Sequence, residues 1–176
     1  QAITGGLRTI QIWDRWQAGA NKKAIISQVK ELAQERQIPV LINNNWELLM
    51  EFELDGIHLD QPAEDLAARK AALGRNFFIG LTCGNELERV EWAIANKLDY
   101  ISFCSMFPSA SAGPCELVSP QTVRKVRQMT SMPLFVSGGI SLQNIDQLKD
   151  TGMDGVAVIS SVLQAEKPAE VVAGFC

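Results

Sequence analysis

Short apolar segments alternate with longer amphipathic segments along the whole chain. The apolar segments lie at residues 9–13, 39–43, 56–59, 77–82, 100–103, 134–136 and 155–159. Apolar runs of this length, bounded by polar residues or glycine, are typical of buried strands. Because they alternate with helical segments, the pattern predicts an α/β protein with parallel strands.

Two of the intervening segments carry apolar residues at helical spacing. The residues are Ile25, Val29, Leu32 and Ala33 in the first segment, and Leu142, Ile145 and Leu148 in the second. This spacing places apolar side chains on one face of a helix. Gly152 follows the second segment, where a glycine C-cap is expected.

Two further segments begin with helix-capping signals. Asn85 and Glu88 have the spacing of a capping box. Ser119 is followed by Pro120, which is the order of an N-cap residue and a first-turn proline. We therefore expect helices that begin close to Asn85 and at Ser119.

A short internal repeat marks three connections from a helix to the next strand. An aspartate at position 55, 99 or 154 follows Leu or Met and comes just before each predicted strand. Aspartate is common in turns for general reasons. Its recurrence at equivalent places supports a regular series of αβ units.

Seven strands in this rhythm fit either an open doubly wound sheet or a barrel. The first strand is not followed by a G-x-G-x-x-G motif, and a glycine pair instead follows the sixth strand of the chain. Residues 1–6 read as the tail of a helix. We therefore predict that residues 1–176 form a single (β/α)8-barrel domain whose first strand and most of whose first helix, about 20 residues, precede this sequence.

Composition excludes several classes of partner. The net charge of −4 and the pI near 5.1 argue against nucleic acid. No apolar run approaches membrane-helix length, and the sequence predicts a cytoplasmic protein. The four cysteines lack C-x-x-C spacing and predict free thiols rather than disulfides. Cys83 and Cys104 each follow a strand and could lie near a ligand.

Two strand ends carry a pattern that suits an anion. Gly138 and Gly139 follow one strand, and Ser160 follows Ile159 at the end of the next. Glycine allows the backbone to approach a ligand, and barrels commonly build phosphate sites from their last two strand ends. An ordinary glycine turn and a serine cap are the alternative. The pairing of the two motifs favours a phosphate site.

Seven motifs across most of the chain resemble the thiamine phosphate synthase family, which includes a thiazole tautomerase. They are IQIWDR at 10–15, LINN at 41–44, DGIHLDQ at 55–61, DYI at 99–101, FPS at 107–109, GGI at 138–140 and GVAVIS at 155–160. The family joins a hydroxymethylpyrimidine diphosphate to a thiazole phosphate, with Mg²⁺ and basic residues stabilising the departing diphosphate. The resemblance implies a small phosphorylated heterocycle as partner.

The resemblance also implies roles for individual residues. The implied pyrimidine and diphosphate residues are Gln11, Arg15, Asn43, His58 and Thr82. The implied phosphate residues are Gly138, Gly139, Ile159, Ser160, Ser109 and Ser111. A packed core residue is the alternative for His58, the only histidine.

Four positions depart from the family pattern. Asn44 and Ala63 stand where the family has metal-binding aspartates, Trp13 where it has an arginine, and Ala112 where it has a lysine. Asn44 is the remaining candidate metal ligand. Because Mg²⁺ is usually held through carboxylates, these replacements argue against full synthase activity. Asp60, Glu64 or Asp65 could instead substitute for Ala63.

Three functions follow from this pattern. The first is a thiamin-biosynthesis transferase, or a remnant of one, that binds a phosphorylated thiazole or thiamin phosphate. The second is a thiazole tautomerase, whose catalytic histidine corresponds to Ser105 here. The third is a non-catalytic barrel that senses thiamin phosphates. The sequence leaves the oligomeric state open.

Overall fold

The computed structural model describes residues 1–13, 16–109 and 116–176. These residues form two compact units, Leu7–Ile79, and Gln1–Gly6 together with Gly80–Cys176. Seven strands follow one another in sequence order, and the pairs registered within each unit are parallel. The predicted α/β class with parallel strands is confirmed. The complete eight-stranded barrel, the preceding strand and the single domain stay predictions.

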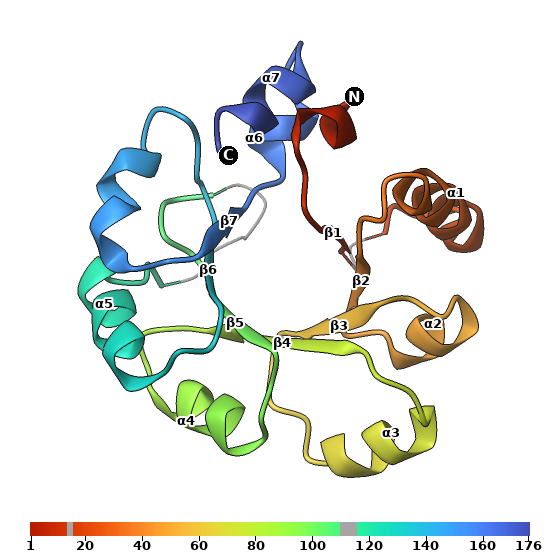
Figure 1. Ribbon diagram of the computed structural model, residues 1–176, viewed down its shortest axis with the longest axis horizontal. Coiled ribbons are helices and arrows are strands. Elements are labelled where there is room, and N and C mark those ends of the chain that lie inside the picture. The colour runs from red at the N-terminus through yellow and green to blue at the C-terminus, as the bar shows by residue number, and fades with distance from the viewer. Residues whose placement is uncertain (14–15, 110–115) are drawn as a thin grey trace. The chain divides into compact units, whose positions relative to one another are not determined.

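The Leu7–Ile79 unit contains three strands and three helices. Its elements are β1 (Ile10–Ile12), α1 (Lys22–Gln34), β2 (Val40–Asn43), α2 (Trp46–Glu51), β3 (Gly56–Leu59) and α3 (Leu66–Leu73). The three helices lie along one side of the strands (Figure 1). Every residue of β2 and β3 is buried, which explains why these strands are continuous apolar runs in the sequence.

The apolar face of α1 differs from the predicted one. Ile26 and Ala33 are buried, whereas Ile25 is 40% exposed and Leu32 is 54% exposed. Ile26 and Ala33 are seven residues apart and therefore lie on the same face of the helix. The sequence contained two overlapping apolar stripes, and only packing chose between them.

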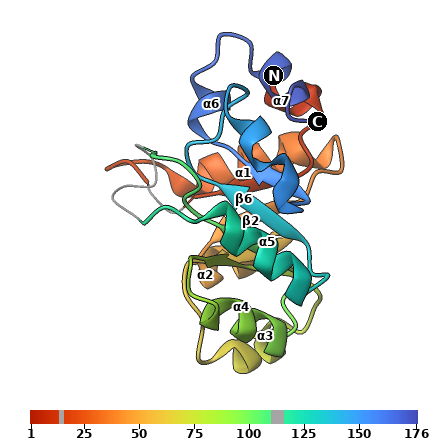
Figure 2. The same cartoon turned by 90° about the vertical axis from the view of Figure 1, so that its left-hand side faces the viewer.

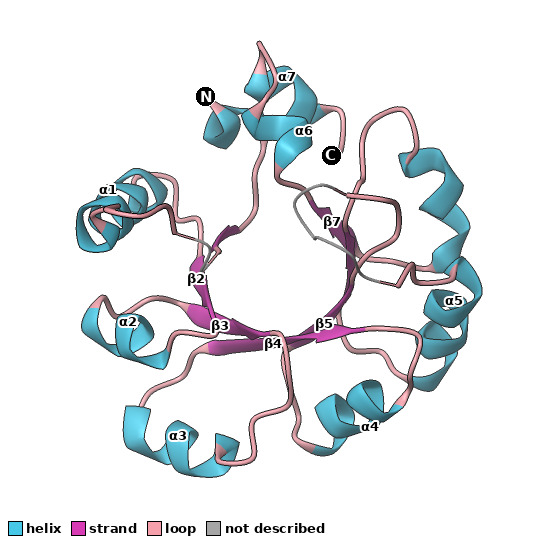
Figure 3. Cartoon of the chain, turned by 180° about the vertical axis from the view of Figure 1, so that it is seen from behind, coloured by secondary structure: helices cyan, strands magenta, loops and turns pink. Residues whose placement is uncertain are grey.

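The second unit contains the remaining strands. Its elements are η1 (Ala2–Gly5), β4 (Phe78–Cys83, which begins in the first unit), α4 (Glu88–Ala95), β5 (Tyr100–Phe103), α5 (Pro120–Met129), β6 (Leu134–Ser137), η2 (Ile145–Thr151), β7 (Gly155–Ala157), α6 (Ser160–Leu163) and α7 (Pro168–Ala173). Helices α4 and α5 lie on one side of the strands (Figure 3). The segment η1 is a 3₁₀ helix that lies beside α7 (Figure 2).

Two of the helix predictions for this unit hold and one is wrong. Ser119 caps α5 by accepting a hydrogen bond from the Gln121 backbone N–H. Gly152, with a φ of 77°, caps η2. The capping box is wrong, because α4 begins at Glu88 without a side-chain cap. The helix predicted from Leu142 starts only at Ile145.

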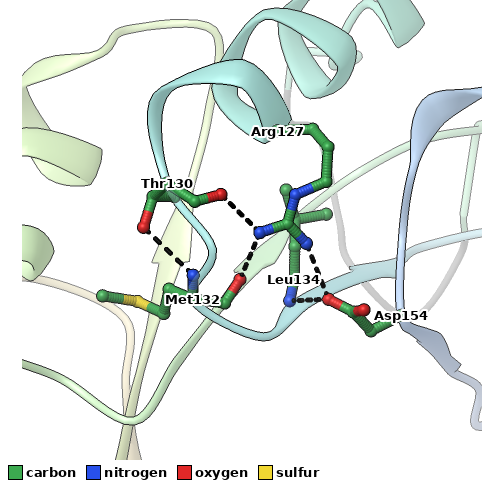
Figure 4. A network of polar contacts seen from close by, with 5 residues as sticks. All are labelled: Arg127, Thr130, Met132, Leu134 and Asp154. Atoms are coloured by element: carbon green, nitrogen blue, oxygen red, sulfur yellow. Dashed lines mark hydrogen bonds and ion pairs between the residues drawn. The ribbon is translucent and has the colours of Figure 1, made fainter.

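The aspartate repeat has a physical cause. Asp55 accepts a hydrogen bond from the Val40 backbone N–H, and Asp154 accepts one from the Leu134 backbone N–H, both at 2.8 Å. Each carboxylate thus holds the first residue of the preceding strand. Arg127 adds an ion pair of 2.8 Å to Asp154 and donates to two backbone carbonyls at the end of α5 (Figure 4).

No described helix has the length and apolar character needed to cross a membrane. Three cysteines are described, Cys83, Cys104 and Cys176, and all three are free thiols, as predicted. Burial raises the pKa of the Cys83 thiol to about 12, so this thiol stays protonated at neutral pH.

Candidate functional site

Polar residues gather at the carboxyl ends of β1, β2 and β3 in the Leu7–Ile79 unit. Asn43 is the last residue of β2 and is registered against His58 of β3. Its side chain is 1% exposed, and its Oδ1 accepts a hydrogen bond of 2.8 Å from Gln11 Nε2. The structure therefore brings together Gln11, Asn43 and His58, which the sequence predicted as pyrimidine and diphosphate residues.

Asn44 and Asp60 form a reciprocal pair beside these residues. Asn44 Nδ2 donates to Asp60 Oδ2 at 2.8 Å, and the Asp60 backbone N–H donates to Asn44 Oδ1 at 2.9 Å. Asn44 has a φ of 53°, a conformation that asparagine tolerates better than most residues. Asn43 Nδ2 donates to the same Asp60 oxygen at 3.1 Å. We call Gln11, Asn43, Asn44 and Asp60 the amide–carboxylate cluster.

His58 lies buried beside this cluster, with only 5% of its surface exposed. Burial lowers its pKa from 6.5 to about 4, although the nearby Asp60 carboxylate opposes the shift. The imidazole is therefore neutral at physiological pH. It can form hydrogen bonds with a heterocycle, but it supplies no positive charge.

The implied metal site was tested against the residues present. Asn44 Oδ1, the only side-chain oxygen of that residue, already accepts the Asp60 backbone N–H. Ala63 offers no ligand, and the described residues contain no cluster of three histidine, cysteine or acidic side chains that could hold an ion. Since Mg²⁺ prefers carboxylates, these residues do not fit the ion.

The glycine pair of the second unit lies where two segments approach closely. Gly138 has a φ of 88°, and a Cβ placed on it would lie 1.9 Å from Ser105 Oγ. Gly139 has a φ of 65°, and its Cβ would lie 2.5 Å from the carbonyl oxygen of Pro108. Both positions therefore require glycine for the fold itself, independently of any ligand.

Backbone hydrogen bonds fasten the segment after β5 to the end of β6. Met106 N–H donates to the Ser137 carbonyl at 2.9 Å, and Phe107 N–H donates to the Gly138 carbonyl at 3.0 Å. Ser105 is fully buried, and its hydroxyl donates to the Phe107 carbonyl at 2.7 Å. The structure thus places Ser109, two residues after Phe107, next in the chain to a segment that lies against the glycine pair.

The loops after β6 and β7 are also joined. Ser161 Oγ donates to the Ile140 carbonyl, and Asn144 Nδ2 donates to the Gly139 carbonyl at 2.9 Å. Ser160 begins α6, directly before Ser161. The two strand ends predicted to form a phosphate site therefore lie together in one unit.

Several predicted residues are placed less fully. Thr82 lies in β4, and it is registered against Ser102. Ile159 is 44% exposed at the start of α6. Arg15 and Ser111, as well as the replaced position Ala112, lie outside the described residues.

Asn85 has a role that sequence reasoning missed. Its Nδ2 donates to Glu116 Oε1 at 2.8 Å and to the Leu117 carbonyl at 3.0 Å. Its Oδ1 accepts from Ser119 N–H at 3.0 Å and from Thr122 Oγ1 at 3.1 Å. The residue therefore holds the start of α5 to the loop after β4. The only sequence signal was an asparagine after a strand, which also resembles a helix cap.

Comparison with known proteins matches residues 1–162 to the family model described as thiamine monophosphate synthase. A thiamine-phosphate synthase of Methanospirillum hungatei is 30% identical over 93% of this chain and 79% of its own length. The thiamine biosynthesis bifunctional protein ThiED of Geobacter sulfurreducens is 33% identical over 96% of this chain, which spans only 34% of that longer protein.

A solved structure has the same fold. The thiamine phosphate pyrophosphorylase from Pyrococcus furiosus superimposes with a TM-score of 0.84 over 99% of this chain and 83% of its own, at 24% identity. This likeness supports the α/β architecture of parallel strands. Since the family model covers most of the sequence and relatives of at least 30% identity cover nearly all of it, the chain belongs to the thiamine monophosphate synthase family.

Proposed function

We propose that this protein is a thiamin-biosynthesis transferase of the thiamine-phosphate synthase type with weakened synthase turnover. It binds a phosphorylated thiazole or thiamin phosphate. The observation that carries this proposal is the hydrogen bond from Ser161 to Ile140, which joins the loops after β6 and β7. In barrel enzymes, adjacent strand ends of this kind form phosphate sites.

In this proposal the phosphate lies against the backbone of Gly138 and Gly139 and the hydroxyl of Ser160. Glycine exposes backbone N–H groups that can donate to phosphate oxygens. Ser109 and Ser111 supply further hydroxyl groups from the loop after β5, and Ile159 contributes backbone. The fixed geometry of this loop, held by Met106 and Phe107, supports the assignment.

The pyrimidine is proposed to contact Gln11, Asn43 and His58, with Arg15 and Thr82 as further contacts. Side-chain amides and a neutral imidazole offer both donors and acceptors, which suits the edge of a nitrogen heterocycle. The family reaction requires the pyrimidine and the thiazole to be held close together, and correct positioning alone can lower a barrier substantially. The replaced residues Asn44 and Ala63 remove charge stabilisation, which is why turnover is proposed to be slow.

Calorimetry with thiazole phosphate, thiamin phosphate and hydroxymethylpyrimidine diphosphate tests this proposal. We expect saturable binding of thiazole phosphate or thiamin phosphate, and weakening of at least tenfold when Gly139 is replaced by alanine. Coupled assays for thiamin phosphate formation then separate slow synthase turnover from none.

Other results would favour the alternatives. Binding without synthase turnover, but with isomerisation of a thiazole phosphate, would identify a tautomerase. Binding without any turnover would identify a sensor of thiamin phosphates. If none of the three compounds bound, the proposed function would be wrong. The oligomeric state, which the same samples yield by light scattering, stays a prediction.

A further inference from the structure

The amide–carboxylate cluster has its negative charge in an unusual place for this family. Where the sequence resembles the family, an aspartate is expected at position 44 and a glycine at position 60, but this chain carries Asn44 and Asp60. The carboxylate has in effect moved across the 2.8 Å hydrogen bond that joins the two side chains. The exchange conserves one carboxylate and one amide, although the carboxylate is now held from a different strand.

The hydrogen-bond directions explain why this carboxylate is fixed. Asn43 and Asn44 both donate to Asp60 Oδ2, and the Asp60 backbone N–H donates back to Asn44 Oδ1. Gln11 donates to Asn43 Oδ1, which orients the Asn43 amide group so that its Nδ2 faces Asp60. Amide dipoles stabilise an anion, but they are neutral and leave its charge in place.

These same bonds consume the oxygen atoms that a divalent cation would use. Asn44 Oδ1 and Asn43 Oδ1 each accept an N–H group, so neither can turn to an ion without losing a hydrogen bond. The neighbouring imidazole of His58 is neutral and adds no positive charge. A doubly or triply charged diphosphate placed here would face the Asp60 carboxylate without a bridging cation.

We infer that the amide–carboxylate cluster has replaced the divalent-cation site of the family, so that this protein takes its pyrimidine partner without metal and in a form that lacks the diphosphate. The inference rests on the proposed function for the identity of the heterocycle. It concerns a different part of the chain from the thiazole-phosphate site.

The test compares three proteins: the wild type, Asp60→Asn, and the exchange variant Asn44→Asp/Asp60→Gly. Mn²⁺ binding is followed by electron paramagnetic resonance, which does not depend on activity. Calorimetry then measures the affinities of hydroxymethylpyrimidine and of its diphosphate, each with and without Mg²⁺. Glu64→Gln is the matched control, because it removes an exposed carboxylate from the same loop.

We expect the wild type to show no saturable Mn²⁺ binding and to bind the pyrimidine alcohol at least as tightly as its diphosphate, with Mg²⁺ changing neither. Asp60→Asn should strengthen diphosphate binding by about tenfold or more, because one negative charge is lost. Glu64→Gln should leave it unchanged. The exchange variant should gain saturable Mn²⁺ binding.

Saturable Mn²⁺ binding by the wild type, or Mg²⁺-dependent diphosphate binding, would overturn the inference. Equal strengthening by Asp60→Asn and Glu64→Gln would also overturn it, since the effect would then be one of general charge. Circular dichroism establishes that each variant is folded. Thiazole-phosphate binding is measured on the same samples. Its absence from the wild type would count against the proposed function and not against the Mn²⁺ result.

Discussion

Asn44 and Asp60 bind each other twice, once through the Asn44 side-chain N–H and once through the Asp60 backbone N–H. The pair joins the residue after β2 to the residue after β3. Because the strands are parallel, both residues lie at the edge of the sheet where the other predicted pyrimidine residues are found. One pair of hydrogen bonds therefore fixes both the loop geometry and the local charge.

Replacing Asn44 by alanine should lower the free energy of unfolding by about 2 kcal/mol. The substitution removes two hydrogen bonds, one of them to a carboxylate, and it leaves the positive φ in place. Gln37→Ala is the control, because Gln37 has a φ of 55° and an exposed side chain. Urea unfolding measures both variants. Equal losses would show that the backbone conformation, and not the pairing with Asp60, accounts for the effect.

The stability of the protein should fall between pH 6.5 and pH 4 because of His58. Burial lowers the pKa of the folded imidazole to about 4, whereas the unfolded chain takes up a proton near 6.5. Since the unfolded state binds more protons in this range, stability is present above pH 6.5 and is lost as the pH falls. The loss is on the order of 3 kcal/mol.

This pH effect can be measured cleanly because His58 is the only histidine. Urea unfolding of wild type and His58→Gln at pH 7.5 and pH 4.5 gives the difference due to this side chain. An NMR titration of the single imidazole should have its midpoint near pH 4. A midpoint near 6.5 would contradict the predicted burial of a neutral ring.

Replacing Gly138 by alanine should destabilise the protein by about 3 kcal/mol or more. The added Cβ would lie 1.9 Å from Ser105 Oγ, and the φ of 88° disfavours any side chain. Gly19→Ala is the matched control, with a φ of 79° and no atom within 4 Å of the added Cβ. It should cost about 1 kcal/mol, which is the conformational part alone.

The thermal midpoints of both glycine variants, measured by circular dichroism, test this comparison. Combining Gly138→Ala with Ser105→Gly should recover part of the loss, because the nearest atom is then removed. If Gly138→Ala and Gly19→Ala had the same midpoint, the close approach of Ser105 would not be the reason for glycine at position 138.

Replacing Asn85 by aspartate should cost about 1–2 kcal/mol. The new carboxylate would face Glu116, from which the Asn85 amide nitrogen is 2.8 Å away, and two donated hydrogen bonds would be lost. Adding Glu116→Gln should restore much of the loss, because the glutamine amide can then donate to the aspartate. A double-mutant cycle in urea measures this coupling, and a coupling energy near zero would exclude the contact.

The sequence alone predicted the strands closely, and it did so for a physical reason. Strands β2 and β3 are buried on both faces and therefore appear as unbroken apolar runs. The aspartate repeat was visible because Asp55 and Asp154 have the same task, which is to hold a strand's first N–H group. Ser119 was recognised as a cap because Pro120 follows it.

Other features could not be predicted from local signals. Asn85 resembles a helix cap, but its partners lie more than 30 residues further along the chain, so only tertiary contacts select between the two roles. The buried face of α1 depended on which of two apolar stripes packed inward. Local spacing is the same in both cases.

The amino-acid sequence by itself determined the class of fold, the order of the strands and the family, because burial and turn chemistry repeat along the chain in a regular pattern. It also marked Gly138 and Gly139 as unusual. Only the tertiary structure decided that this pair makes room for Ser105 and Pro108, and that Asp60 is held by Asn43 and Asn44. Such roles depend on distances of about 3 Å between segments far apart in the sequence, and hydrogen bonds act only at that range.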